Sequence, residues 1–255
     1  MSRWGRILVG CGLGVIAILV YLPLFGCQTV LAVYAWYSGW EIPYLWKVPV
    51  PLSEQSISKA PGRRLSYFGY EFEVPWNDLD EAHTKLLRNW QVISFKSGKM
   101  IVFMGHEPDG SLKTNPAVRT FMREEIIPGR YGYDYAIIGQ ILDASPDEIT
   151  PFTSRRKAIG AFGSLTLKQV WLDAESGIYM IDTPEFHGFQ YGNPESGVRE
   201  IRDELYSKEG SVGFMFPRRN GALVSQAEIN RVIQTVRRID DQRSDFRTMG
   251  AQPMQ

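Results

Sequence analysis

The chain of 255 residues is 44% hydrophobic and carries 28 basic and 28 acidic side chains, so its formal net charge is zero. That length accommodates a membrane segment followed by one domain with its own core. The lack of a basic excess argues against a nucleic-acid partner, because binding to phosphates requires a positive surface. Both cysteines, Cys11 and Cys27, lie near the N-terminus, so the rest of the chain offers neither a disulfide nor a thiolate metal site.

An uncharged N-terminal stretch predicts a membrane anchor. No charged residue or histidine occurs between Arg6 and Glu41, and residues 7–25 are almost entirely apolar. As a helix that segment spans roughly 28 Å, close to the hydrocarbon thickness of a bilayer. It is longer than the apolar core of a typical signal peptide, which favours an anchor that is retained. Because Arg3 and Arg6 precede it, the positive-inside rule places the N-terminus in the cytoplasm and the main domain outside.

Residues 24–27 support an alternative in which the chain is a lipoprotein. Their sequence, Leu-Phe-Gly-Cys, resembles the lipobox of bacterial lipoproteins and makes Cys27 a lipidation candidate. Phe25 departs from that pattern, and the apolar residues that follow are unlike the polar tether usual in such proteins. We expect an uncleaved anchor, with acylation at Cys27 as the alternative.

Five aromatic residues follow the anchor within a short stretch: Trp36, Tyr37, Trp40, Tyr44 and Trp46. Indole and phenol rings favour the headgroup region of a bilayer, because one end is apolar and the other polar. The stretch is therefore either an interfacial segment that touches the outer leaflet or another membrane protein, or a tilted continuation of the anchor helix.

The remaining sequence predicts one α+β domain with a mainly antiparallel sheet packed by helices. We expect the anchor in residues 1–28, a juxtamembrane segment and linker in 29–62, the domain in 63–240 and a polar tail in 241–255. Alternation of apolar and polar residues predicts strands within 65–76 and 212–216. Two apolar runs, 91–95 and 100–104, are separated by a turn at 96–99 and predict a hairpin, and further strands are predicted within 177–182, 186–191 and 198–206. Apolar spacing and start signals predict helices within 79–90, 116–122, 137–142 and 154–172.

The last predicted helix has the strongest pattern in the chain. Residues 225–228, Ser-Gln-Ala-Glu, form a capping box, and the apolar residues after it share one face. Those residues are Ile229, Val232, Ile233, Val236 and Ile239. We expect this face to pack on the sheet strands around Val74, 100–104 and 212–216.

No complete catalytic set is present in the sequence. The nucleophile motif GxSxG is absent, and Ser154 with Lys157 matches only the bare SxxK of serine enzymes that use a lysine base. His187 is a candidate acid or base, and in an extended segment Glu185 would share its face. Phosphate loops and metal-ligand spacings are missing too, so we predict no cofactor. The basic residues 155–157 either bind an anionic group or form a solvated face.

The segment from Gly69 to Trp76, GYEFEVPW, and the order of the elements after it resemble the PsbP-type α/β/α domain of photosystem accessory proteins and some bacterial envelope lipoproteins. That resemblance implies an accessory or binding role and no shared catalytic residues. The chain as a whole also resembles bacterial membrane-anchored proteins. We therefore expect a single-pass, membrane-anchored binding or accessory module, with an envelope protein as a candidate partner. The alternative is a cell-envelope hydrolase that uses His187 or Ser154.

Overall fold

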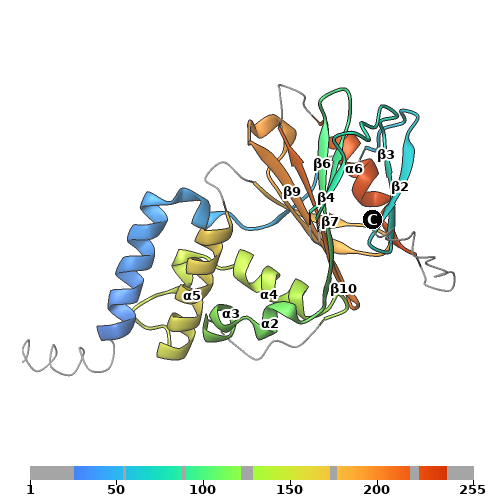
Figure 1. The fold of residues 1–255 in the computed structure, drawn as a ribbon. Helices are drawn as coiled ribbons and strands as arrows, with labels where there is room; N and C mark the ends of the chain where they lie inside the picture. The colour runs from blue at the N-terminus through green and yellow to red at the C-terminus, as the bar shows by residue number, and fades with distance from the viewer. Residues whose placement is uncertain are drawn as a thin grey trace, which may run out of the picture.

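The computed structural model describes residues 26–53, 56–87, 90–121, 129–172, 177–218 and 224–239. These residues form an α+β fold with a mostly antiparallel sheet packed by helices, as the sequence predicted (Figure 1). The predicted anchor, residues 7–25, and the predicted tail, residues 241–255, lie outside the described residues.

The larger sheet has eight strands in the described part of the chain, in the order β1-β7-β8-β9-β10-β6-β5-β4. Every neighbouring pair described is antiparallel except β1 with β7, which is parallel. In that order the strands are Val50–Pro51, Ile178–Asp182, His187–Tyr191, Glu200–Ser207, Gly210–Pro217, Met100–Pro108, Trp90–Ser94 and Lys85–Leu87. The predicted hairpin of β5 and β6 and the predicted strands from β7 to β10 are confirmed.

A second sheet and α6 (Gln226–Gln234) cover one face of the larger sheet. The second sheet consists of β2 (Arg63–Tyr67), β3 (Tyr70–Val74) and β11 (Arg237–Arg238). Phe68 and Gly69 have φ values of 54° and 81°, which join β2 to β3 through a tight turn of two residues. The predicted alternation in β3 is confirmed, because its first, third and fifth residues are buried.

The predicted capping box of α6 is confirmed, since the Ser225 hydroxyl accepts from the Glu228 N–H. Four of the five predicted apolar residues are buried and pack with Val74, Phe103 and Phe214, among others. Ile239 is the exception, because it is 42% exposed and follows the helix and β11. The chain turns at Thr235, whose hydroxyl accepts from the Glu73 N–H, so β11 pairs with the free edge of β3.

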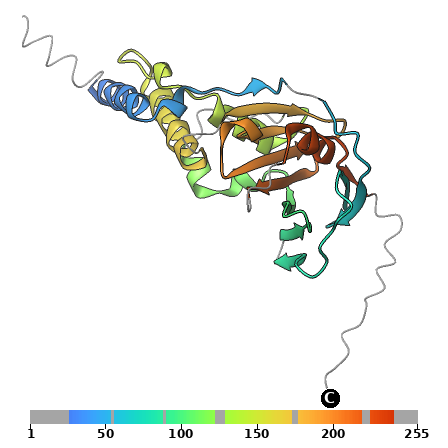
Figure 2. The ribbon, with the colours of Figure 1, turned by 90° about the horizontal axis from the view of Figure 1, so that it is seen from above.

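Helices cover the other face of the larger sheet, which gives three layers (Figure 2). Sequence pattern correctly predicted α3 (Pro116–Phe121), α4 (Tyr133–Leu142) and α5 (Arg155–Trp171). The described helical turns that were not predicted are α2 (Ser111–Thr114), η1 (Pro43–Trp46) and η3 (Pro194–Ser196). A further turn, η2 (Pro146–Glu148), lies where the sequence of residues 145–148 indicates a helix start.

The predicted helix within residues 79–90 is wrong. Leu79 forms a bridge with Phe95, a turn follows at residues 81–83, and Lys85–Leu87 is β4 at the edge of the sheet. Leu86 and Leu87, expected on a buried stripe, are 59% and 48% exposed. The hydrogen bonds offered by the edge of β5 outweigh the local helical pattern, because tertiary context commonly overrides propensity.

A helix over residues 26–41 packs along α5. Small side chains allow the close approach, with Ala32 and Ala35 on the first helix and Ala158 and Ala161 on α5. Near the far end of the pair, the fully buried Lys168 donates from Nζ to the carbonyl oxygens of Leu45 and Ala144, at 3.1 and 2.8 Å. Within the described residues, no helix combines the length and the hydropathy required to cross a bilayer.

Candidate functional site

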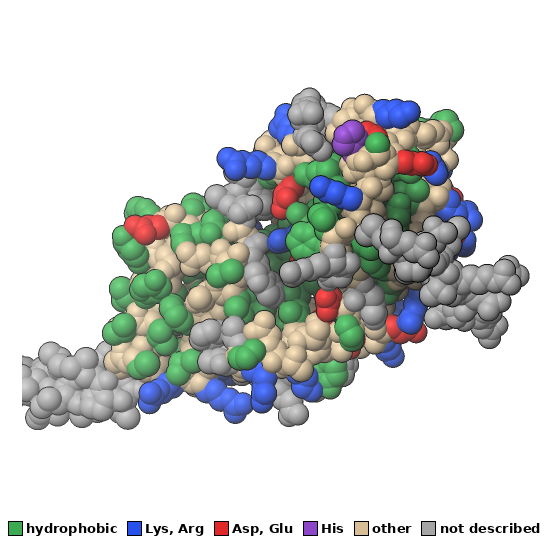
Figure 3. Space-filling model, viewed as in Figure 1, with side chains coloured by type: hydrophobic (Ala, Val, Ile, Leu, Met, Phe, Trp, Pro, Cys, Tyr) green, Lys and Arg blue, Asp and Glu red, His purple; other side chains and the backbone are tan. Residues whose placement is uncertain are grey.

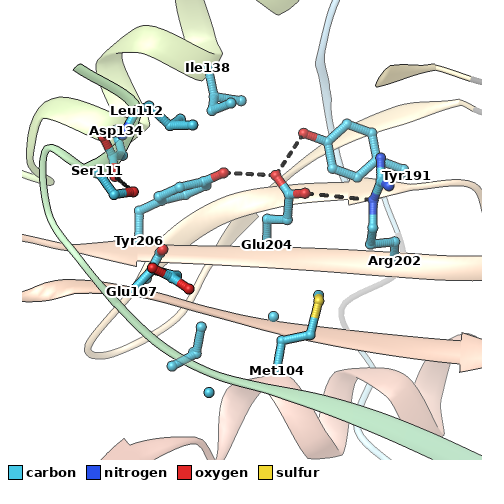
Figure 4. Close-up of a pocket in the computed structure, with 14 residues that line it drawn as sticks. Met104, Glu107, Ser111, Leu112, Asp134, Ile138, Tyr191, Arg202, Glu204 and Tyr206 are labelled. Carbon is cyan, nitrogen blue, oxygen red and sulfur yellow. Dashed lines mark hydrogen bonds and ion pairs between the residues drawn. The ribbon is translucent and has the colours of Figure 1, made fainter. Parts of the chain in front are cut away.

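A cavity of about 340 Å³ lies between the larger sheet and the helices α2 and α4 (Figure 4). The sheet contributes side chains from β6, β8, β9 and β10, and the helices contribute Ser111, Leu112, Asp134 and Ile138. A cleft of this size between a sheet and its covering helices is a typical place for a small-molecule site. It is therefore the candidate functional site.

Alternation along β9 divides its charged residues between the cavity and the core. Arg202, Glu204 and Tyr206 line the cavity, whereas Ile201, Asp203 and Leu205 are buried, two of them in the core beneath α6. Tyr191 of β8 lies opposite Arg202 in the ladder, so its ring reaches the same cavity. The strand period and the register of two strands thus build the polar part of the site.

The centre of the site is the Glu204 carboxylate. Its Oε2 accepts hydrogen bonds from the hydroxyls of Tyr206 and Tyr191, at 2.7 and 3.2 Å, and its Oε1 lies 3.6 Å from Nε of Arg202 (Figure 4). The Arg202 guanidinium also lies over the Tyr191 ring, 4.7 Å from its centroid. Burial, and then the charge of Glu204, raises the pKa of both tyrosines well above the ordinary value. Both rings therefore stay neutral and act as donors.

A second carboxyl, Asp134, belongs to the helical wall. It is 2% exposed and accepts from the Ser111 hydroxyl at 3.0 Å and from the Leu112 N–H at 3.1 Å. Burial raises the pKa of this carboxyl, although the hydrogen bonds from Ser111 and Leu112 act in the opposite direction. The neighbouring Asp109 accepts from the N–H groups of Tyr133 and Asp134 and so caps α4.

The cavity combines engaged polar groups with apolar surface. Its described lining contains no histidine, cysteine or lysine, and the carboxyls of Glu204 and Asp134 are engaged in hydrogen bonds within the protein. Apolar surface from Met104, Leu112 and Ile138 is left for a ligand. A small organic molecule with an apolar body is the class that such a lining accepts.

His187, the predicted acid or base, lies elsewhere, at the start of β8. Its Nδ1 is 3.0 Å from Oδ1 of Asp182, and its ring packs on Tyr131 with centroids 3.4 Å apart. Burial lowers the pKa of His187, Asp182 acts in the opposite direction, and Arg130 lowers it further. The expected partner Glu185 instead accepts from the backbone N–H of Arg238. In the described part of the chain no serine hydroxyl bonds to this imidazole.

Two cavities adjoin His187, and the larger, of about 410 Å³, also borders Ser207. The Ser207 hydroxyl donates to the carbonyl oxygen of Gly210, so it is directed into its own turn. The structure therefore supplies a histidine and a carboxylate, and the nucleophile of a triad is missing from the contacts of the described residues.

The other predicted site residues lie in the helical layer. Ser154 and Lys157 are exposed at the start of α5, and Ser154 caps that helix without a side-chain hydrogen bond. Cys27 is an exposed free thiol on the helix over residues 26–41. Among the predicted aromatic residues, the exposed ones are Trp36, Tyr37, Trp40 and Trp46, whereas Tyr44 packs between two core clusters.

The residues that form the cavity were not predicted as a site. Once residues 198–206 are taken as a strand, alternation alone places Arg202, Glu204 and Tyr206 on one face. The meeting of that face with Tyr191 and Asp134 depends on register and on helix packing, which the sequence did not reveal. Nowhere in the described residues do three or more His, Cys, Asp or Glu side chains gather closely enough to hold a metal ion.

Comparisons with known proteins identified no relative of this chain. No protein-family model matches the chain, and neither a curated protein nor a solved structure matches it significantly. The resemblance to the PsbP-type domain accordingly stays a prediction.

Proposed function

We propose that this protein is a membrane-anchored binding module, with its N-terminus in the cytoplasm and its α+β domain outside. The observation that carries the proposal is the helix over residues 26–41, which follows directly on the uncharged run of residues 7–25 and leaves one side uncovered. Its inner side packs on α5 through Ala32 and Ala35.

The uncovered side of that helix is unusually apolar for a surface. The exposed fractions are 68% for Val30, 63% for Val33, 56% for Tyr34, 58% for Trp36 and 73% for Trp40. Figure 3 displays this surface as a group of hydrophobic side chains at the left of the molecule. Contiguous exposed apolar surface commonly marks contact with a membrane or a protein, and tryptophan and tyrosine favour the bilayer interface. We assign this surface to the membrane interface.

The binding role rests on the cavity at Glu204, which is concave, has apolar walls and holds a hydrogen-bonded carboxylate at its centre. The pair of Asp182 and His187 favours the second candidate, a cell-envelope hydrolase. That alternative requires a nucleophile within reach of His187 once a substrate is bound. A lipoprotein acylated at Cys27 would keep the envelope location and the binding role, with a different attachment.

Reporter fusions test the location. A reporter that is active only outside the cytoplasm, fused after Ile239, is expected to be active. The matched control is the same fusion in a chain with residues 7–25 deleted, which should lose that activity because the export signal is gone. Activity of a cytoplasm-only reporter at Ile239 in the intact chain would refute the proposed orientation.

A further inference from the structure

We infer that the tip of α5, residues 152–157, docks on anionic lipid headgroups beside the anchor. This inference rests on the proposed membrane attachment and goes beyond it, because it assigns a second, charge-dependent contact with the bilayer. The tip has the sequence Phe-Thr-Ser-Arg-Arg-Lys and joins the loop after η2 to the first turn of the helix.

Within the described residues, no acidic side chain pairs with the positive charge at the tip. Arg155, Arg156 and Lys157 are all exposed, and the first turn of α5 contains no acidic residue. Among the described residues, none of the three forms an ion pair. The positive end of the helix dipole also disfavours cations at that position. An anionic surface would remove both unfavourable features.

The tip lies level with the point where the apolar run ends. The ring of Tyr34 contacts that of Phe162 at 5.4 Å, and Lys168 reaches the carbonyl of Leu45, so the first helix and α5 run in the same direction. Figure 1 shows the two helices side by side at the left of the molecule, both rising from its lower edge. Arg155 precedes Phe162 by about as many residues as Cys27 precedes Tyr34, roughly 10 Å of helix in each case. The cations therefore stand beside Cys27, directly after the membrane segment, where headgroups lie.

The same tip carries apolar side chains that suit the interface. Phe152, just before the cations, is 80% exposed. Ile159 is 42% exposed and follows Arg155 and Arg156 by one helical turn, so it shares their face. Figure 3 displays basic side chains along the lower edge of the helical layer, next to the hydrophobic surface. Cations beside exposed apolar residues are typical of segments that bind the surface of an anionic membrane.

A depth probe on the full chain tests the inference. Cys11 and Cys27 are replaced by serine, Ser154→Cys is labelled with a polarity-sensitive fluorophore, and the protein is reconstituted into nanodiscs. Ser154 is suited to the label because it is exposed and its side chain makes no capping hydrogen bond. The lipids are phosphatidylcholine alone or its mixture with phosphatidylglycerol, and the readouts are emission wavelength and quenching by acrylamide, which is uncharged.

We expect a blue shift and protection from acrylamide in the anionic discs only, both decreasing with added salt. Each basic residue near an anionic surface strengthens binding about fivefold, so replacing Arg155, Arg156 and Lys157 by glutamine should shift the docking equilibrium roughly 100-fold. A control replaces three exposed cations of the sheet layers, Lys85, Lys96 and Lys208, by glutamine and should retain the protection. Phe152→Ser should weaken docking without removing its dependence on lipid charge.

Two failures have different meanings. If the chain enters the discs but the probe is equally quenched in both lipids, or if the triple variant behaves as the parent, the docking inference is overturned and the anchor stands. If the chain does not enter discs of either composition, the proposed attachment is itself wrong and the inference falls with it.

Discussion

Replacing Asp203 by asparagine should stabilise the protein relative to the parent, and this gain should grow as the pH rises. Asp203 is fully buried, and neither of its carboxyl oxygens has a hydrogen-bond partner. Its neighbours in the ladder are Gln190 on β8 and Phe214 on β10. Burial raises the pKa of this carboxyl well above its ordinary value, and the adjacent charge of Glu204 adds to that effect. The native state therefore holds a proton on Asp203 that the unfolded chain releases.

The direction and size follow from proton linkage. An aspartate in the unfolded chain loses its proton near pH 4, whereas the folded Asp203 keeps it to higher pH. Between those two pKa values the native state binds one more proton than the unfolded state, so each pH unit lowers the free energy of unfolding by about 1.4 kcal/mol. Asparagine has nearly the same shape and does not titrate. The stability of Asp203→Asn relative to the parent should accordingly increase by about 1.4 kcal/mol per pH unit from about pH 4 up to the pKa of the folded Asp203, and stay constant above it.

Urea unfolding of the full chain in a mild detergent, followed by tryptophan fluorescence from about pH 4 to about pH 8, measures this difference. The matched control is Asp147→Asn, at an exposed position in η2, which should leave the pH profile unchanged. Parallel profiles for the parent and Asp203→Asn would mean that Asp203 ionises in the folded protein as it does in the unfolded chain. The reasoning from burial would then be refuted.

Three further predictions concern the core, the helix pair and the N-terminus. Val232→Asp should lower the free energy of unfolding by more than about 3 kcal/mol, because it buries an unpaired charge. Val170→Asp, at a position 75% exposed, should lower it by less than about 1 kcal/mol, and urea unfolding compares the two variants. Lys168→Met should destabilise the chain by roughly 1–3 kcal/mol, because two buried carbonyls lose their donor. It should also speed proteolysis between residues 41 and 46, and equal cleavage rates in the variant and the parent would contradict this. Intact-mass measurement should find an unacylated chain that retains its first 26 residues, and an acylated species beginning at Cys27 would contradict the anchor.

Patterns within one element predicted that element well. The alternation in β3, the alternating apolar residues of β10 and the capping box at Ser225 all arise from contacts made by near neighbours in sequence. Their apolar faces also found the expected partners, because residues with so much apolar area have few places to be buried. The broad α+β architecture was predictable for the same reason.

Features that depend on distant segments were not predictable. Residues 79–90 carry a helical pattern, yet the backbone of β5 pairs with Lys85–Leu87 and so decides their structure. The length of α6 was likewise overestimated, since β11 is recruited by the edge of β3. A single-sequence pattern contains no information about which strand edge is available.

The cavity illustrates the same limit at the level of function. The hydroxyls of Tyr191 and Tyr206 meet at Glu204 only because β8 and β9 are neighbours in this register, and a shift by one residue would direct these side chains into the other layer. α4 completes the site and also ties it to the rest of the helical layer. Ile138 lines the cavity, whereas Ile137 and Ile141 pack against Val118 and Leu167 of the helical layer. Because α5 carries both Leu167 and the basic tip, the element proposed to touch lipid and the wall of the candidate site share one packed layer.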